Sequence, residues 1–465
     1  MSLERIDTGA WREAIAAHIG DGARFVGGWA VGDEWRVALS AAGRETIVLG
    51  CRAVDGRVPT IVDFVPAAGW DEREAHDLHG LGFDGHEPLR ALATHAADAA
   101  AWMTPVDGDG VHEVAVGPIH AGVIESGHFR FHVVGERILA LDPRLFYKHR
   151  GLERAAEGRS PEEALPLAQR ACAACAVTNA VAYAHAVEEA LGLWPDRDLR
   201  VARTLLLELE RLYNHLHDIG ALCAGVGFAP GTMAFAALKD RAQRLNERLT
   251  GHRFLFGAVA AGAGAFTVDG PTADAAREIV RELSADASAA WRELEFATSV
   301  QARLGGVGVL DHGAATALGA AGPAARAAGV HSDVRSESPR LWYGGFVAAS
   351  PRRATGDVAA RMELRAVELE TTYEALDELL ARPVAAGSTT RSAEPRSVGV
   401  GRVESPRGAT LAAVELAHGR IARMRLRTGS YANWPALAHA ATGNLLPDFP
   451  LINKSFELCY ACVDR

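Results

Sequence analysis

Cysteine is scarce in this chain, with six residues among 465. A count this low excludes a small secreted fold held together by disulfides, and a reducing compartment would keep all six as thiols. Four of the six nevertheless fall in two Cys-x-x-Cys pairs, Cys172 with Cys175 and Cys459 with Cys462. Their arrangement is therefore more informative than their number.

Long hydrophobic runs are also missing. No window reaches the roughly 18 consecutive apolar residues that a membrane-spanning helix requires, and the nearest approach is the alanine- and glycine-rich stretch 255–266. Residues 1–5 do not begin a basic segment followed by an apolar run, which is the pattern of a secretory signal. We therefore expect a cytoplasmic protein that does not cross a membrane unaided.

Positive charge is in deficit as well. The formal net charge of -10 argues against nucleic-acid binding, so the expected partners are proteins or small molecules. An apolar share of 49% and a charged share of 23% are typical of a globular protein. A chain of 465 residues has room for two or three domains.

The first part of the chain mixes short β-like runs, at 35–40 and 45–49, with helical patterns. A stretch rich in Ala, Asp and Gly, which contains Pro105, follows this part. The sequence therefore predicts a small N-terminal α/β domain at residues 1–95 and a linker at residues 96–110.

The rest of the chain begins with an alternating pattern that predicts a β-hairpin and then becomes largely helical. Apolar residues recur every three or four positions in two stretches, and the simplest interpretation of both is helix core. The expected elements are a hairpin at 111–134, helices over 205–219 and 362–380, a loop at 383–396, and strands at 409–416 and 421–426. Residues 111–465 are thus predicted to form a large, mainly α domain with peripheral β-strands, and the whole fold is α+β.

The two cysteine pairs predict a metal site. Two thiolates separated by two residues can bind one soft metal centre, and two such pairs provide four sulfur ligands. Zinc ribbons hold their pairs about 15–20 residues apart, whereas 284 positions separate Cys175 from Cys459. Spacing alone leaves three alternatives open: a structural zinc site, a nickel–iron or other redox metal centre, and cysteines that only pack.

Several ordered motifs resemble the large subunits of nickel–iron hydrogenases. The Cys172 and Cys175 segment is similar to the first signature of that family, and Cys-x-x-Cys-x-x-Arg at 459–465 is similar to the second. Residues 404–408 (Glu-Ser-Pro-Arg-Gly) resemble the arginine-bearing loop over the iron. The remaining similar segments are 117–120, 125–130, 149–153 and 158–164.

Within that family, the chain resembles the branch related to respiratory complex I, which includes formate hydrogenlyase and energy-converting hydrogenases. Residues 72–86 are similar to the signature of the 30-kDa subunit of complex I. Residues 146–151 and 203–220 are similar to its 49-kDa subunit. The resemblance covers nearly the whole chain and implies a fusion of the two subunit types.

The resemblance implies a role for each site residue. Cys172 and Cys459 would be terminal ligands of nickel, whereas Cys175 and Cys462 would bridge nickel and iron, and the iron would carry CO and CN ligands. Arg407 would place a fixed cation over the open metal position, with a surface-loop arginine as the alternative. Glu125 would accept the proton released from H2, with a surface carboxylate as the alternative.

The resemblance also implies an activity and partners. The expected enzyme is a hydrogenase that catalyses H2 ⇌ 2 H+ + 2 e−, with electrons passing through an iron–sulfur small subunit similar to the 20-kDa subunit of complex I, which carries a 4Fe–4S cluster. Membrane antiporter-like subunits and a formate dehydrogenase or ferredoxin-like subunit are further expected partners. Through them the protein would be peripheral on the inner face of the cell membrane.

Three departures from the family pattern affect the site without removing a ligand. Ala173 stands where a glycine is usual, Asn179 where a histidine is frequent, and Glu457-Leu458 where Asp-Pro is common. Asn179 can still donate a hydrogen bond toward a bridging sulfur, but it cannot carry a proton. A quinone-pocket or scaffold subunit of the complex I type, without hydrogenase turnover, is the alternative function.

Overall fold

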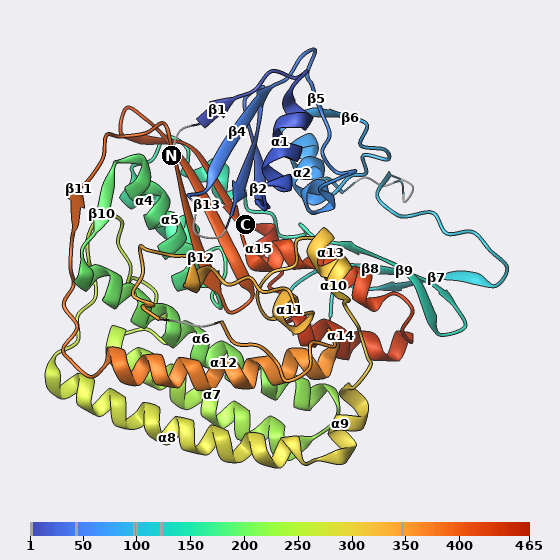
Figure 1. Ribbon diagram of the computed structural model, residues 1–465. Helices are drawn as coiled ribbons and strands as arrows, with labels where there is room; N and C mark the ends of the chain where they lie inside the picture. The colour runs from blue at the N-terminus through green and yellow to red at the C-terminus, as the bar shows by residue number, and fades with distance from the viewer. Residues whose placement is uncertain (1–2, 42–44, 96–97, 99–100, 121–123, 346–347) are drawn as a thin grey trace.

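The computed structural model describes residues 3–41, 45–95, 98, 101–120, 124–345 and 348–465 (Figure 1). Its N-terminal unit, defined here as elements β1 to β6, contains a four-stranded sheet in the order β1-β4-β3-β2, with β1 parallel to β4. The bounds are β1 (Leu3–Arg5), α1 (Trp11–Gly20), β2 (Arg24–Val31), β3 (Glu34–Ser40), β4 (Ile47–Arg52), β5 (Arg57–Pro59), α2 (Gly69–His79) and β6 (Gly82–Asp84).

Strand β3 is buried on both faces, which explains why it lacks a clean apolar–polar alternation. Trp35 and Val37 pack on one face into a core with Trp11 of α1. Ala38, on the other face, packs into a second core with Val400 and neighbouring residues of the C-terminal sheet. The N-terminal unit is therefore attached to the rest of the molecule through a sheet-on-sheet contact.

A three-stranded antiparallel sheet follows the N-terminal unit, formed by β7 (Val111–Val116), β8 (His128–Val134) and β9 (Arg137–Arg144). The predicted hairpin region is thereby confirmed. Within the predicted linker 96–110, residues 96, 97, 99 and 100 lie outside the described residues. The domain boundaries at 95 and 111 stay a prediction.

Four long helices pack side by side and form a bundle at one end of the molecule (Figure 1). They are α6 (Arg197–Gly225), α7 (Ala229–Thr250), α8 (Gly270–Glu295) and α12 (Val358–Leu379). The predicted leucine stripe lies on α6 and is core, since Leu205, Leu209 and Leu212 are fully buried. Asp196 begins this helix by accepting the amide of Leu199 at 2.8 Å.

Shorter elements complete the large part of the fold. They are α3 (Leu152–Ala156), α4 (Pro161–Gln169), α5 (Ala176–Ala190), β10 (Leu193–Pro195), α9 (Thr298–Leu304), α10 (His312–Ala317), α11 (Gly322–Ala327) and β11 (Thr389–Arg391). Strand β11 interrupts the predicted loop 383–396 and pairs with β10. Among the described residues, no helix combines the length and apolar character needed to cross a membrane.

The C-terminal sheet lies between α5 and the N-terminal sheet. It contains β12 (Val398–Ser405), β13 (Gly408–Ala417) and β14 (Arg420–Arg427), followed by α13 (Gly429–Ala441), α14 (Phe449–Phe456) and α15 (Ala461–Asp464). The strands predicted at 409–416 and 421–426 correspond to β13 and β14, whereas β12 was not predicted. Its Gly399 and Gly401 lie so close to α5 that an added Cβ would approach the carbonyl oxygens of Ala186 and Ala182 to 1.9 Å.

The predicted α+β class is confirmed. A small N-terminal sheet unit is followed by a helical bundle with associated sheets. The C-terminus lies beside the N-terminal unit (Figure 1), so segments from both ends of the chain meet near α15.

Candidate metal centre

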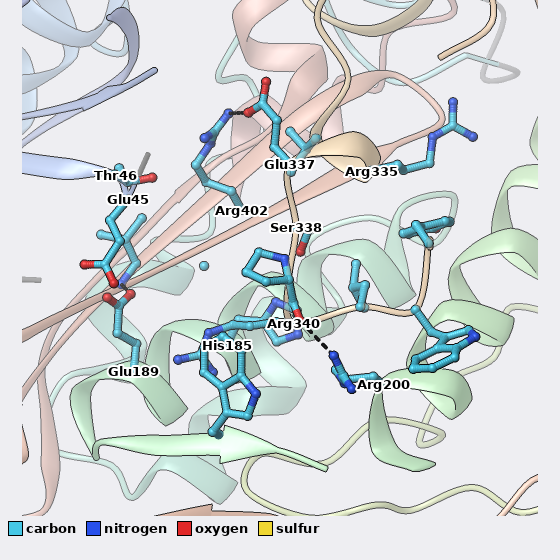
Figure 2. A pocket seen from close by; sticks show the side chains of 18 of the residues that line it. Glu45, Thr46, His185, Glu189, Arg200, Arg335, Glu337, Ser338, Arg340 and Arg402 are labelled. Atoms are coloured by element: carbon cyan, nitrogen blue, oxygen red, sulfur yellow. Dashed lines mark hydrogen bonds and ion pairs between the residues drawn. The ribbon is translucent and has the colours of Figure 1, made fainter. Parts of the chain in front are cut away.

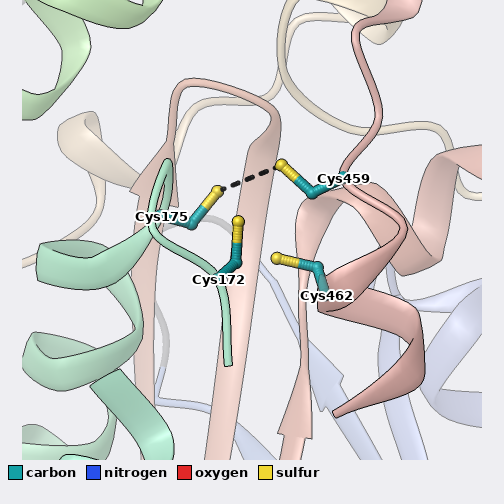
Figure 3. Close-up of side chains that lie close together, drawn as sticks. All are labelled: Cys172, Cys175, Cys459 and Cys462. Atoms are coloured by element: carbon teal, nitrogen blue, oxygen red, sulfur yellow. Dashed lines mark hydrogen bonds between the residues drawn. The ribbon is translucent and has the colours of Figure 1, made fainter. Parts of the chain in front are cut away.

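The two cysteine pairs come together at the end of α5 nearest the C-terminal segment (Figure 3). Cys172 lies in the turn before α5, and Cys175 is the residue at which that helix begins. Cys459 follows α14, and Cys462 lies in α15. One sulfur atom from each residue lies within 4.8 Å of the other three.

The sulfur geometry fits a metal site and not a disulfide. The Sγ atoms of Cys175 and Cys459 are 4.0 Å apart, about twice the length of a disulfide bond. All four cysteines are free thiols, and only Cys459 is more than slightly exposed. Four convergent soft donors in a mostly buried position suit zinc, nickel or iron.

The electrostatics favour a thiolate at Cys459. Hydrogen bonds from the thiols of Cys172, Cys175 and Cys462 hold the pKa of Cys459 well below its usual value, and the nearby Arg407 adds to this effect. The pKa of Cys175 is raised because its contacts with the other thiols and its burial both favour the neutral form. A positive metal charge would reverse that preference, because it stabilises thiolates.

Arg407 lies in the turn between β12 and β13 and is 3% exposed, so it is not a surface arginine. The turn is fixed locally: the amide of Arg407 donates to Ser405 Oγ at 3.0 Å, and that hydroxyl donates to the carbonyl of Gly408 at 2.8 Å. Its guanidinium forms an ion pair with Asp218 of α6. Although burial opposes it, this carboxylate raises the pKa of Arg407, and the interaction with the Cys459 thiolate adds to the effect.

Glu125 lies beside the second cysteine pair. Its carboxylate accepts the backbone amide of Ala461, the residue between Cys459 and Cys462, at 2.8 Å. Glu125 is exposed as a residue, and partial desolvation raises the pKa of its carboxyl group. Of the motif at 117–130, residues 121–123 lie outside the described residues.

Two further acidic groups lie at the site: Asp218, which sequence reasoning missed, and Glu457, which it named only as a departure from the family pattern. Asp218 binds Arg407, and Glu457 lies near both Asp218 and Cys459; burial and then the charge of Asp218 raise the pKa of Glu457 to about 7. The signal for Asp218 was present on α6, where Glu208, Arg211, His215 and Asp218 recur every three or four positions. This polar stripe runs beside the leucine stripe and is fully buried.

Asn179 lies one turn into α5 and is buried. Neither its amide nitrogen nor its amide oxygen has a hydrogen-bond partner among the residues that the structure describes. A buried amide without partners costs free energy, so a bound group that accepts a hydrogen bond from Asn179 would stabilise the fold. The hydrogen bond from Asn179 toward a bridging sulfur stays a prediction.

A cavity of about 830 Å³ lies elsewhere, between β10, the end of α5 and residues 334–345 (Figure 2). His185, Arg200 and Arg340 line it. None of the four cysteines, Arg407 or Glu125 is among its lining residues. The metal-binding group is therefore separate from this cavity.

Three family models match this chain. The model of the respiratory-chain NADH dehydrogenase 49 Kd subunit matches residues 226–390 and 385–465, and that of the 30 Kd subunit matches residues 35–106. The nickel-dependent hydrogenase model matches residues 150–250, which include the first cysteine pair. The N-terminal and C-terminal parts thus match different subunits of one respiratory complex.

Curated relatives and a solved structure agree with these matches. Hydrogenase-4 component G of Escherichia coli (strain K12) is 32% identical over 462 residues, which cover 92% of this chain and 80% of the relative. Formate hydrogenlyase subunit 5 of the same organism is 31% identical, with coverages of 88% and 77%. A chain of an archaeal membrane-bound sulfane sulfur reductase superposes with a TM-score of 0.70 at 27% identity, covering 78% of this chain and 100% of that one. This protein belongs to the family of catalytic large subunits of complex-I-related, nickel-dependent hydrogenases.

Proposed function

We propose that Cys172, Cys175, Cys459 and Cys462 hold a nickel–iron centre at which the protein interconverts H2 with protons and electrons. The observation that carries this proposal is the convergence of four thiols, each within 4.8 Å of the others, next to the buried guanidinium of Arg407. A structural zinc site needs only the thiols and gives no reason for a buried cation beside them.

The donor set fits the group that the family implies. Four sulfur ligands suit a soft, redox-active metal pair. Cys172 and Cys459 would hold the nickel, and Cys175 and Cys462 would hold it together with an iron that would carry CO and CN. When bound, this centre would supply the cleavage and formation of H2. The protein residues around it supply charge, orientation and proton transfer.

Arg407 is the group that fixes positive charge beside the sulfurs. Two contacts to Asp218 hold its guanidinium plane, and the Asn433 side-chain amide donates to its carbonyl oxygen at 2.9 Å. A cation immobilised in this way can stabilise anionic ligands and developing negative charge without reorganising.

Glu125 is the group that moves protons. Its carboxylate contacts the amide between Cys459 and Cys462, and its raised pKa makes it a stronger base than an ordinary glutamate. Its exposed side provides the way out to solvent. Glu125 would thus accept a proton on a carboxylate oxygen and release it to water.

Electron transfer requires a partner. Outside the four-thiol group only Cys51 of β4 and Cys223 of α6 remain, and they lie in different hydrophobic cores. Two separated cysteines cannot hold an iron–sulfur cluster. The proposed partner is an iron–sulfur small subunit with a 4Fe–4S cluster, together with membrane antiporter-like subunits and a formate dehydrogenase or ferredoxin-like subunit, which would place the protein at the inner face of the cell membrane.

Infrared spectroscopy of the purified complex, combined with metal analysis, tests the proposal. We expect bands of iron-bound CO and CN together with nickel, and iron in excess of nickel because the 4Fe–4S cluster of the partner also contributes iron. Stoichiometric zinc without such bands would support the zinc scaffold instead. Absence of nickel, zinc and the CO and CN bands would favour the alternative of a quinone-pocket or scaffold subunit, because the only iron would then belong to the cluster of the partner.

A further inference from the structure

Helix α2 of the N-terminal unit carries three buried acidic side chains close together. Asp71 is 1% exposed, Glu72 is 0% exposed and Glu74 is 3% exposed. A buried carboxylate is costly unless it is paired, so each of them must have partners. The partners differ for each of the three acids.

Among the described residues, the hydrogen-bond partners of Glu72 all lie in the first 86 residues of the chain. Its carboxylate accepts from Thr60 Oγ1 at 2.6 Å and from the amide of Ile61 at 3.1 Å, and it contacts His86 Nδ1 at 2.8 Å. Glu72 therefore stabilises the N-terminal unit locally.

Asp71 connects two sheets. It accepts from Arg427 Nε at 2.9 Å and from Arg425 Nη2 at 3.0 Å, both on β14, and from the amide of Gly28 on β2 at 3.3 Å. These contacts attach the N-terminal unit to the C-terminal sheet. They do not involve the cysteine segment, defined here as residues 459–465.

Glu74 reaches the cysteine segment itself. Its carboxylate pairs with Arg425 and with Arg465, which is three residues beyond Cys462. Arg465 also donates from Nε to Glu153 at 2.7 Å, and its guanidinium lies 4.9 Å from the centre of the Tyr431 ring. The two arginines outweigh burial and hold the pKa of Glu74 well below its usual range.

Helix α15 depends on such contacts because it has only four residues. A helix of one turn is not stable alone. Its anchors include the Arg465 side chain, hydrogen bonds from the amides of Arg150 and Gly151 to the Arg465 carbonyl, and one from Thr428 Oγ1 to the Cys462 carbonyl at 3.4 Å. Further contacts join Asp464 to the amide of Lys148 at 3.1 Å and to His149 Nδ1 at 2.7 Å, and the Ala461 amide donates to Glu125 at 2.8 Å. The ion pair to Glu74 is the anchor that comes from the N-terminal unit.

We propose that Glu74 is a positioning residue through which the N-terminal unit holds Arg465, and with it Cys462, in the metal-binding geometry. This inference rests on the proposed function. Without the Glu74 carboxylate, Arg465 and Arg425 would share the remaining negative charge of Glu153 and Asp71 in a buried place. The Arg465 side chain would then be exposed to solvent more often, and α15 would unfold locally more often.

The test compares three substitutions on one helix in the purified complex: Glu74→Gln, with Glu72→Gln and Asp71→Asn as matched controls. Metal release into excess EDTA is measured, together with the infrared bands of the centre. We expect Glu74→Gln to lose nickel about tenfold faster than the parent and to shift the bands. Both controls should lower the melting temperature while release stays within about twofold of the parent.

Glu74→Asp provides the second variant, since it keeps the charge on a shorter side chain. It should restore part of the parental retention, and it remains informative if Glu74→Gln fails to assemble. Parental release from Glu74→Gln, or from Glu74→Asp where only that variant assembles, would overturn the proposal. Equal acceleration by the controls would also overturn it, because the effect would then be general destabilisation.

Failure of the proposed function gives a different result. In that case the parent itself lacks CO and CN bands. Release of whichever metal the four thiols hold would still report whether Glu74 acts on Cys462.

Discussion

Asp218 binds both terminal nitrogens of Arg407, with Nη1 to Oδ2 at 2.7 Å and Nη2 to Oδ1 at 2.9 Å. This two-point contact fixes the plane of the guanidinium as well as its position. Asp218 is held in turn by Arg365 Nε at 3.0 Å. The cation beside the thiols is therefore part of a rigid buried network.

The first prediction concerns this geometry. Arg407→Lys keeps the positive charge but cannot make the two parallel contacts. We expect the variant to retain nickel and iron while H2 turnover falls about tenfold or more, equivalent to about 1.4 kcal/mol in the barrier. Metal analysis and H2 evolution with a reduced dye measure both quantities.

Arg420→Lys, at the exposed start of β14, is the control and should match the parent in both assays. Parental turnover in Arg407→Lys would show that the orientation of the guanidinium is unimportant.

The second prediction concerns the ligands. Cys175→Ser or Cys462→Ser replaces a soft bridging sulfur with a hydroxyl that binds soft metals poorly, so each purified variant should lack stable nickel. Elemental analysis checks this. Cys223→Ser, which changes a buried cysteine outside the four-thiol group, should keep its nickel. Unchanged nickel in both bridging variants would rule out the assigned ligand set.

The third prediction concerns proton transfer. Glu125→Gln keeps the size of the side chain and its hydrogen-bonding capacity but removes the basic carboxylate. We expect parental nickel, iron and infrared bands, together with loss of H2 evolution and of D2 exchange with water. Exchange is the sharper assay because it needs proton transfer but no electron flow through a partner.

Glu113→Gln is the matched control for Glu125, since Glu113 is an exposed glutamate of β7 that pairs with Arg130. It should exchange at the parental rate. If Glu125→Gln also exchanges at that rate with its metals intact, protons leave through another group.

The fourth prediction concerns pH. Glu210 of α6 accepts the amides of Val177 and Thr178 at the start of α5, and burial raises its pKa to about 7. The folded state thus binds this proton more tightly than the unfolded state. Stability should fall as pH rises from about 4.5 to about 7, by about 3 kcal/mol from this group.

Glu210→Gln mimics the protonated carboxyl at every pH and should reduce that slope. Melting temperatures of parent and variant across this range provide the measurement. Glu457 titrates in the same range, so part of the slope should remain in the variant. An unchanged slope would mean that Glu210 is already ionised in the folded protein.

The spacing of apolar residues predicted those helices and strands whose buried faces follow a regular period in the sequence. The leucines of α6 and the runs that became β13 and β14 follow helix and strand periods. Strand β12 was not predicted because glycine has a low strand propensity. Gly399 and Gly401 are needed here because the strand packs so close to α5 that a side chain would not fit, and this requirement appears only in the folded structure.

The site divides in the same way. Spacing and motif resemblance predicted the four cysteines, Glu125 and Arg407 as site residues. Asp218 and Glu74 were missed because their partners, Arg407 and Arg465, are 189 and 391 positions away in sequence. No period or short motif relates positions so far apart, and only the packed structure shows the pairs.

The separation of the cysteine pairs also determines when the centre can be loaded. Cys175 and Cys459 are 284 positions apart, and the sheet and bundle between them must pack before the two pairs meet. A nickel ion offered to a nascent or unfolded chain encounters only isolated two-thiol segments, which bind weakly because the long loop has not closed. All four thiols are therefore presented together to a metal only once α5 and α15 have packed against each other.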